Sequence, residues 1–170
     1  MKTPRLFKTV ALVWACAALA MTVPAEARPI TAHAGTTFTL TPIEFDTGGN
    51  PTKFAHTVDG VVRVSLFGNC TVHFDVIAVP ASPTTFGLTG TCQITTADGT
   101  STLALEVNGT VAIDTANPAF GDFRYDAKIS GGTGRMAAAR GKATIDGFAM
   151  FTSPGTGKAT WVMIGLVADQ

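Results

Sequence analysis

The stretch SGGTGRMAAARG at residues 130–141 contains the glycine pattern G-x-G-x-x-A, formed by Gly132, Gly134 and Ala137. Glycines at this spacing are one form of the loop that holds the pyrophosphate of a dinucleotide at a helix N-terminus. That loop has to follow a parallel strand and open a helix. Here too few residues remain before the next strand-like run, KATIDGFAMF, to form such a helix. We therefore expect no cofactor, and a corner between strands where the glycines permit positive φ angles.

Histidines and carboxylates offer a second kind of chemistry. His73 and Asp75 share one face of an expected strand, and a remote His56 could complete a metal site. A solvated polar face explains the first two residues more simply, so we expect no metal. The serines lack the G-x-S-x-G context of a nucleophile, and the acidic residues lie on different expected strands. No catalytic residue is assigned.

The cysteines indicate a disulfide. Cys70 and Cys92 lie on either side of an expected hairpin that turns near residues 80–82, which would place them opposite each other. An exported chain with two cysteines is expected to bond them, which would stabilise the fold by about 3 kcal/mol. The alternative is a pair of free, buried thiols.

We expect β-strands to position all of these candidate residues. Threonine is abundant, and Gly, Pro, Asn and Asp interrupt the chain at short intervals, which is typical of all-β proteins. Eight antiparallel strands without long helices predict a single closed β-barrel, with a β-sandwich as the alternative. Such a barrel holds either packed side chains or one small ligand. The expected strands cover residues 36–46, 61–68, 70–79, 84–96, 101–114, 120–131, 142–152 and 158–168.

Two of these strands carry a distinct pattern. In DFRYDAKI, Tyr125 alternates in step with Phe123 and Ile129, so it points with the apolar set. It is either a hydroxyl in a pocket or a core tyrosine. In KATWVMIGLVA both faces are apolar over residues 161–167. A packed loop or a second subunit on the outer face would explain this, as would a thick core.

The segment GGTGRMAAARG resembles the GGTG-x-F-x-x-ARG segment of plant dirigent proteins. It is also similar to the GGTGRFAGA-type segment of secreted bacterial proteins with allene oxide cyclase-like barrels. The resemblance covers roughly residues 60–150 and implies an eight-stranded antiparallel barrel. Met136 stands where the dirigent motif has an aromatic residue. The residues that match the motif are Gly131, Gly132, Thr133, Gly134, Ala139, Arg140 and Gly141.

The resemblance also implies a function. Dirigent proteins guide the coupling of phenoxy radicals, and allene oxide cyclases close a ring in a fatty-acid-derived epoxide. Both hold an apolar substrate inside the barrel. Arg140 is the one matched residue with useful chemistry, because a guanidinium can steer a phenolate or a carboxylate. A structural arginine that binds backbone carbonyls is the alternative.

Residues 1–27 have the features of a secretory signal peptide. A positively charged start is followed by the apolar run 9–23, which is too short to span a bilayer, and by the small-x-small sequence Ala25-Glu26-Ala27. Lipid attachment at Cys16 is not expected, because Trp14 is bulky at a position where lipid-attachment signals prefer a small residue. The protein is therefore expected to be exported, either secreted or periplasmic.

The remaining chain is expected to form a loose lead-in at residues 28–35 and one barrel domain at 36–170. No segment after the signal is apolar and long enough to span a membrane. The chain has 12 Lys and Arg residues against 12 Asp and Glu residues, so its formal net charge is zero. Because no basic patch is present, we expect neither nucleic acid nor anionic lipid as a partner.

The leading functional hypothesis is an exported barrel that binds a small apolar or phenolic molecule, oriented by Arg140 or Tyr125. An isomerase or cyclase similar to allene oxide cyclases is the second hypothesis, although we favour a protein that is not an enzyme. The third is a structural or interaction protein of the envelope or secreted milieu. It would self-associate through the last strand.

Overall fold

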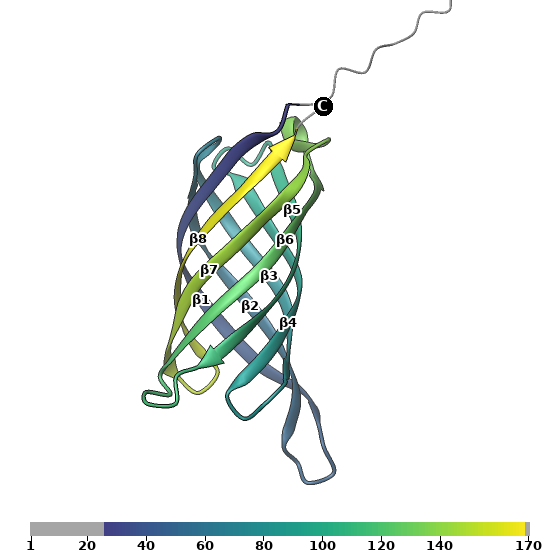
Figure 1. Cartoon of the computed structure of the whole chain (residues 1–170). Coiled ribbons are helices and arrows are strands. Elements are labelled where there is room, and N and C mark those ends of the chain that lie inside the picture. The colour runs from purple at the N-terminus through teal and green to yellow at the C-terminus, as the bar shows by residue number, and fades with distance from the viewer. Residues whose placement is uncertain (1–25, 169–170) are drawn as a thin grey trace, which may run out of the picture.

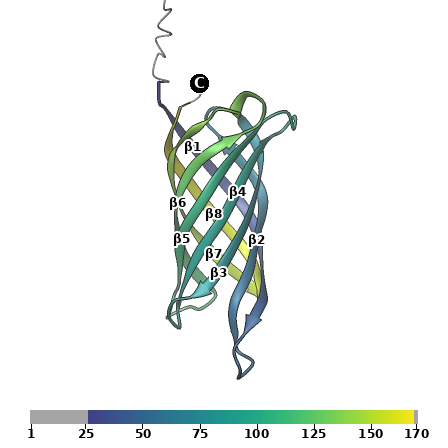
Figure 2. The same ribbon diagram turned by 90° about the vertical axis from the view of Figure 1, so that its right-hand side faces the viewer.

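The computed structural model of the protein describes residues 26–168, which form eight antiparallel strands closed into one barrel (Figures 1 and 2). The order around the barrel follows the sequence, and the last strand returns to pair with the first. The β-barrel prediction is confirmed, and the sandwich alternative is wrong. The strands are β1 (Arg28–Phe45), β2 (Pro51–Val64), β3 (Gly68–Pro80), β4 (Thr85–Thr96), β5 (Thr102–Ile113), β6 (Phe120–Gly132), β7 (Arg140–Ser153) and β8 (Thr156–Ala168).

The first two strands are longer than the sequence indicated. β1 begins at Arg28, so residues 28–35 are not a loose lead-in but the first half of a strand. Their inward side chains, Ile30, Ala32 and Ala34, alternate with exposed residues and are buried against β2 and β8. From β3 onward the expected boundaries agree with the observed ones to within two residues.

The expected signal peptide lies almost entirely outside the described residues, which begin at residue 26. Within residues 26–168 no helix is long and apolar enough to cross a membrane.

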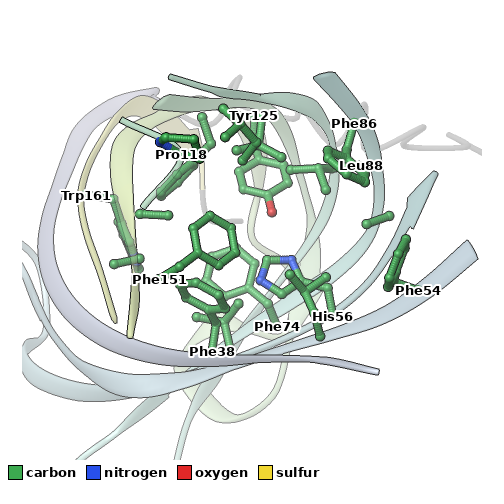
Figure 3. A pocket seen from close by; sticks show the side chains of 18 residues that line it. Phe38, Phe54, His56, Phe74, Phe86, Leu88, Pro118, Tyr125, Phe151 and Trp161 are labelled. Carbon is green, nitrogen blue, oxygen red and sulfur yellow. The ribbon is translucent and has the colours of Figure 1, made fainter. Parts of the chain in front are cut away.

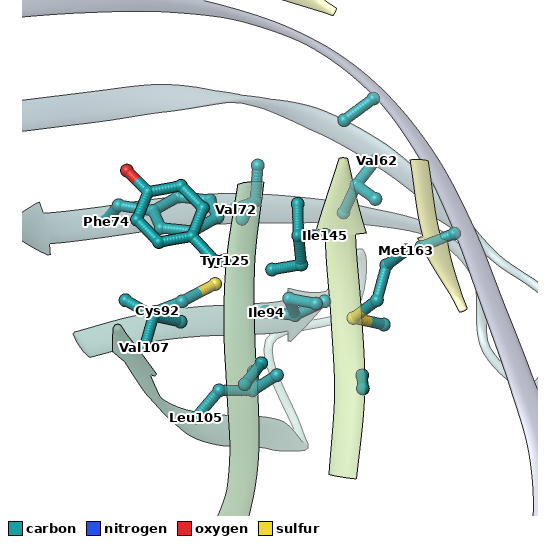
Figure 4. Packing of buried hydrophobic residues seen from close by; sticks show 14 of the residues in the cluster. Val62, Val72, Phe74, Cys92, Ile94, Leu105, Val107, Tyr125, Ile145 and Met163 are labelled. Atoms are coloured by element: carbon teal, nitrogen blue, oxygen red, sulfur yellow. The ribbon is translucent and has the colours of Figure 1, made fainter. Parts of the chain in front are cut away.

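The two ends of the barrel differ. At one end, which we call the plugged end, lie residues 65–67, 97–101 and 133–139, together with the start of β1 and the end of β8 (top of Figure 1). A short 3-10 helix, η1 (Gly134–Met136), covers this end and buries Met136. Inward Val, Ile, Leu and Met side chains fill the adjoining half of the barrel (Figure 4). The opposite end, which we call the cavity end, carries residues 46–50, 81–84, 114–119 and 154–155.

The predicted pairing of Cys70 with Cys92 is wrong. Cys70 lies opposite Thr96, and Cys92 lies opposite Phe74, so the two cysteines are offset by four residues along the β3–β4 ladder. At roughly 3.3 Å per residue this offset is about 13 Å, well beyond the reach of a disulfide. Both are free thiols whose side chains point into the barrel, 3% and 1% exposed respectively.

We expect neither thiol to react in the folded protein. Burial raises the pKa of both thiols, so the reactive thiolate is scarce in addition to being inaccessible. In a Cys16→Ser chain, a thiol-reactive dye should label no cysteine under native conditions and two after unfolding without reductant. A disulfide would instead leave both cysteines unlabelled after unfolding.

Candidate functional site

A cavity of about 230 Å³ lies inside the cavity end of the barrel (Figure 3). Every strand contributes to its wall, and Pro118 comes from the loop between β5 and β6. The wall is almost entirely carbon, and much of it is aromatic. The lining residues are Phe38, Leu40, Phe54, His56, Val58, Phe74, Ala78, Phe86, Leu88, Val111, Ile113, Pro118, Phe123, Tyr125, Ala149, Phe151, Ala159 and Trp161.

The aromatic rings hold one another in place around this space. Phe38 packs edge-to-face on Phe151, with ring centroids 5.1 Å apart, and Phe74 packs in the same way on Trp161 at 5.8 Å. Such pairs add stability beyond the area they bury. Gly147 lies on the inner wall, where a Cβ would come within 2.5 Å of the Thr160 carbonyl oxygen and 2.6 Å of Phe123 Cζ. The missing side chain is therefore what lets the aromatic wall approach the backbone.

Three polar side chains interrupt this wall: His56, Tyr125 and Trp161. His56 Nδ1 and Trp161 Nε1 are buried without a hydrogen-bond partner. Burial lowers the pKa of His56 to about 4, so the imidazole is neutral at pH 7. Burial, with a smaller contribution from Cys92, raises the pKa of Tyr125, so its hydroxyl stays protonated.

Of the two predicted ligand-binding residues, the structure places only Tyr125 in the cavity. Its alternation with Phe123 and Ile129 is confirmed, since the burial pattern of β6 places all three side chains inward. Arg140 lies at the plugged end, at the start of β7, and its side chain is exposed. Its Nη1 donates to the Ala139 carbonyl at 2.6 Å. Arg140 therefore cannot orient a ligand in this cavity, and its contact is the structural one considered as the alternative.

The GGTG motif forms a corner between β6 and β7. Gly131 and Gly134 have φ angles of 139° and 56°, as expected for glycines that permit positive φ. The Thr133 N–H donates to the Thr102 carbonyl at 3.0 Å, and the Thr102 N–H donates back to Thr133 Oγ1 at 3.1 Å. The helix that follows has three residues, so it provides no phosphate site.

The three residues weighed for a metal site do not converge. His56 points into the barrel, whereas His73 lies on the outer wall, between two carboxylates. Its Nδ1 is 2.7 Å from Asp59 Oδ1, and its Nε2 is 3.1 Å from Asp75 Oδ2. The hydrogen bond to Asp59 is the main cause that raises the pKa of His73. This cluster is a solvent-exposed hydrogen-bonded group on the outer wall.

Comparison with known proteins identifies the architecture. No protein-family model matches the chain, and no curated protein does. A solved structure, that of the pterocarpan synthase dirigent protein GePTS1, superposes with a TM-score of 0.50 over 85% of this chain and 88% of that one. The fold is a dirigent-like barrel. At 16% sequence identity this likeness concerns the fold.

Sequence reasoning missed most of the cavity of this dirigent-like barrel. The inward residues of early β2 are Phe54, His56 and Val58, and the polar histidine in the middle breaks the apolar alternation that reveals a strand. The chain carries 11 phenylalanines, and six of them line the cavity, but the convergence of these six depends on the closure of the barrel. The one usable signal was the placement of Tyr125 among apolar neighbours.

Proposed function

We propose that this dirigent-like barrel binds a small apolar molecule in the cavity at its cavity end. The observation that supports this is an unfilled space whose wall is carbon and aromatic, in a barrel otherwise packed with side chains. A cavity of about 150 Å³ lined by aliphatic and aromatic side chains stays dry and takes up benzene. The 230 Å³ space therefore suits a substituted ring or two fused rings.

Binding would be driven by removal of apolar ligand surface from water, at about 25 cal/mol per Å². The wall needs little rearrangement, because the ring pairs already fix its shape. We propose export of the chain as well, on the sequence of residues 1–27 alone. The mass of the chain recovered from the medium or the periplasm would show whether cleavage occurs before Arg28.

A ligand of the cavity should raise the melting temperature. At 100 times Kd the expected gain is roughly 5–10 °C for a domain of this size. The panel is fatty acids, phenols and uncharged aromatic molecules. An Ala149→Leu variant fills the cavity and should lose the response, whereas Ala112→Leu adds the same side chain on the exposed outer wall and should keep it. If no compound raises the wild-type melting temperature, the binding proposal fails.

An isomerase or cyclase is the alternative within the same cavity. It needs a polar group against the substrate, and the residues available for this role are His56 and Tyr125 rather than Arg140. Turnover of a genuine substrate that survives replacement of both residues would rule out this assignment.

We also propose self-association through the outer face of β8. Trp161 and Met163 are buried inside the barrel, while Ile164 and Leu166 on the opposite face are 65% and 55% exposed. The row continues through Val162 on the same face. Exposed apolar rows of this kind mark protein interfaces.

Substituting Ile164 with lysine should therefore shift the protein from an oligomer to a monomer in sedimentation velocity. The desolvation of a lysine within an apolar interface is costly. Thr160→Lys places the same charge on the same strand, in a position that is already polar, and is the matched control. A wild-type chain that sediments as a monomer at all concentrations would remove this proposal.

A further inference from the structure

Two of the three polar side chains in the cavity wall face each other; the third, Trp161, has its Nε1 buried without a partner. Tyr125 projects from β6 and His56 from β2, and Figure 3 shows the hydroxyl and the imidazole directed into the same central space. Within residues 26–168 neither side chain makes a hydrogen bond to another side chain. Among the residues that line the cavity, none is Lys, Arg, Asp or Glu.

The environment of His56 selects one tautomer. Of the two ring nitrogens, only Nδ1 is both buried and without a partner. A proton on Nδ1 would be a buried donor with no acceptor, and such orphaned N–H groups are rarer in proteins than lone pairs left unpaired. The proton of the neutral ring therefore belongs on Nε2. This leaves Nε2–H as a donor, alongside the O–H of Tyr125.

The charge state of the cavity restricts its ligands further. The low pKa of His56 keeps the imidazole neutral, and Tyr125 remains protonated. A carboxylate or phenolate would lose its hydration here without meeting a cation. An oxygen that only accepts hydrogen bonds can take both neutral donors at once, whereas a hydroxyl could do so only if its own hydrogen turned to a further acceptor.

We infer that the cavity recognises an uncharged molecule through a carbonyl oxygen placed between Tyr125 Oη and His56 Nε2. This inference rests on the proposed binding function and names the ligand class. The apolar body of the ligand occupies the aromatic wall, and the carbonyl is the one polar anchor. The ligand is then a ketone, aldehyde or ester rather than an acid.

Three probes of matched shape test this: 2-acetylnaphthalene, its hydrocarbon twin 2-isopropenylnaphthalene, and 2-naphthoate. Dissociation constants are measured at pH 7 by equilibrium dialysis. The ketone and the hydrocarbon should both bind, and the carboxylate should bind at least about 100-fold more weakly than the ketone. In Tyr125→Phe and in His56→Leu, the preference for the ketone over the hydrocarbon should fall about fivefold relative to wild type. His73→Gln, on the outer wall, should leave this preference unchanged.

Infrared spectroscopy gives a readout that needs no variant. The carbonyl stretch of bound, ¹³C-labelled 2-acetylnaphthalene should lie below its position in a hydrocarbon solvent, because two donors weaken the C=O bond. An unshifted band, or equal ketone preference in wild type and both cavity variants, would overturn the carbonyl inference while leaving the binding function intact. Tighter binding of the naphthoate would overturn the argument from charge. Failure of all three probes to bind would instead contradict the binding function itself.

Discussion

Replacing Gly132 with alanine is expected to lower the free energy of unfolding by about 3 kcal/mol or more. The added Cβ would lie 1.9 Å from the Thr102 carbonyl oxygen, and no side-chain rotation relieves this distance, because the backbone fixes the position of the Cβ and the oxygen is itself a backbone atom. That oxygen cannot withdraw without cost, since it accepts the hydrogen bond from the Thr133 N–H. The substitution must therefore break the corner that joins β6 to β7.

Urea unfolding followed by circular dichroism measures this effect. Gly35→Ala is the matched control, because Gly35 lies on the outside of β1, at a negative φ, with nothing within 4 Å of the added Cβ. The control should leave stability unchanged or raise it by up to about 1 kcal/mol. Equal stability of wild type and Gly132→Ala would mean that the corner adapts, and the structural interpretation of the GGTG motif would be wrong.

His56 should make the barrel sensitive to acid. Its pKa is about 4 in the folded protein and near 6.5 in the unfolded chain, so the unfolded state takes up a proton first as the pH falls. Its contribution to stability is unaffected above about pH 6.5 and is lost progressively down to about pH 4. The full loss is on the order of 3 kcal/mol, from the difference between the two pKa values.

The measurement compares wild type with His56→Leu in urea at pH 7, 5.5 and 4.5. The free energy of unfolding of the wild type should decrease relative to that of His56→Leu as the pH falls. His73→Gln is an informative second comparison, because the raised pKa of His73 gives the opposite sign: its contribution is present below about pH 6.5 and disappears as the pH rises through its folded pKa. A parallel pH dependence for wild type and His56→Leu would show that His56 is not desolvated.

The fold was largely predictable, because strands of alternating burial separated by Gly and Pro turns have a strong local signal. The β3–β4 hairpin shows that this local signal does not determine the strand register. The prediction centred its turn at residue 81, but the Ala81 N–H and the Ser82 N–H both donate to the Thr85 carbonyl, and Pro80 pairs with Phe86. A turn centre displaced by two residues moves every cross-strand pair by four, and this separated the two cysteines.

The candidate site was less predictable, for a different physical reason. Arg140 belongs to the recognisable motif, but the motif is defined by the steric needs of a backbone corner, which lies at the opposite end of the barrel from the cavity. His56 has no motif. Its importance comes from burial and from the lack of a partner for Nδ1, and both depend on the closure of the barrel, which brings residues of the distant strands β6, β7 and β8 into the same cavity.

The seam between β1 and β8 determines when the barrel can form. Arg28 pairs with Val167 and Thr39 with Thr156, so the first strand completes its second ladder only after nearly the whole chain has been synthesised. Until then the apolar inner face of β1 lacks one neighbour. Contacts this far apart in sequence slow folding, because the closure entropy is lost before the contacts form. The barrel can therefore close only late in folding, and its cavity is complete only with that last step.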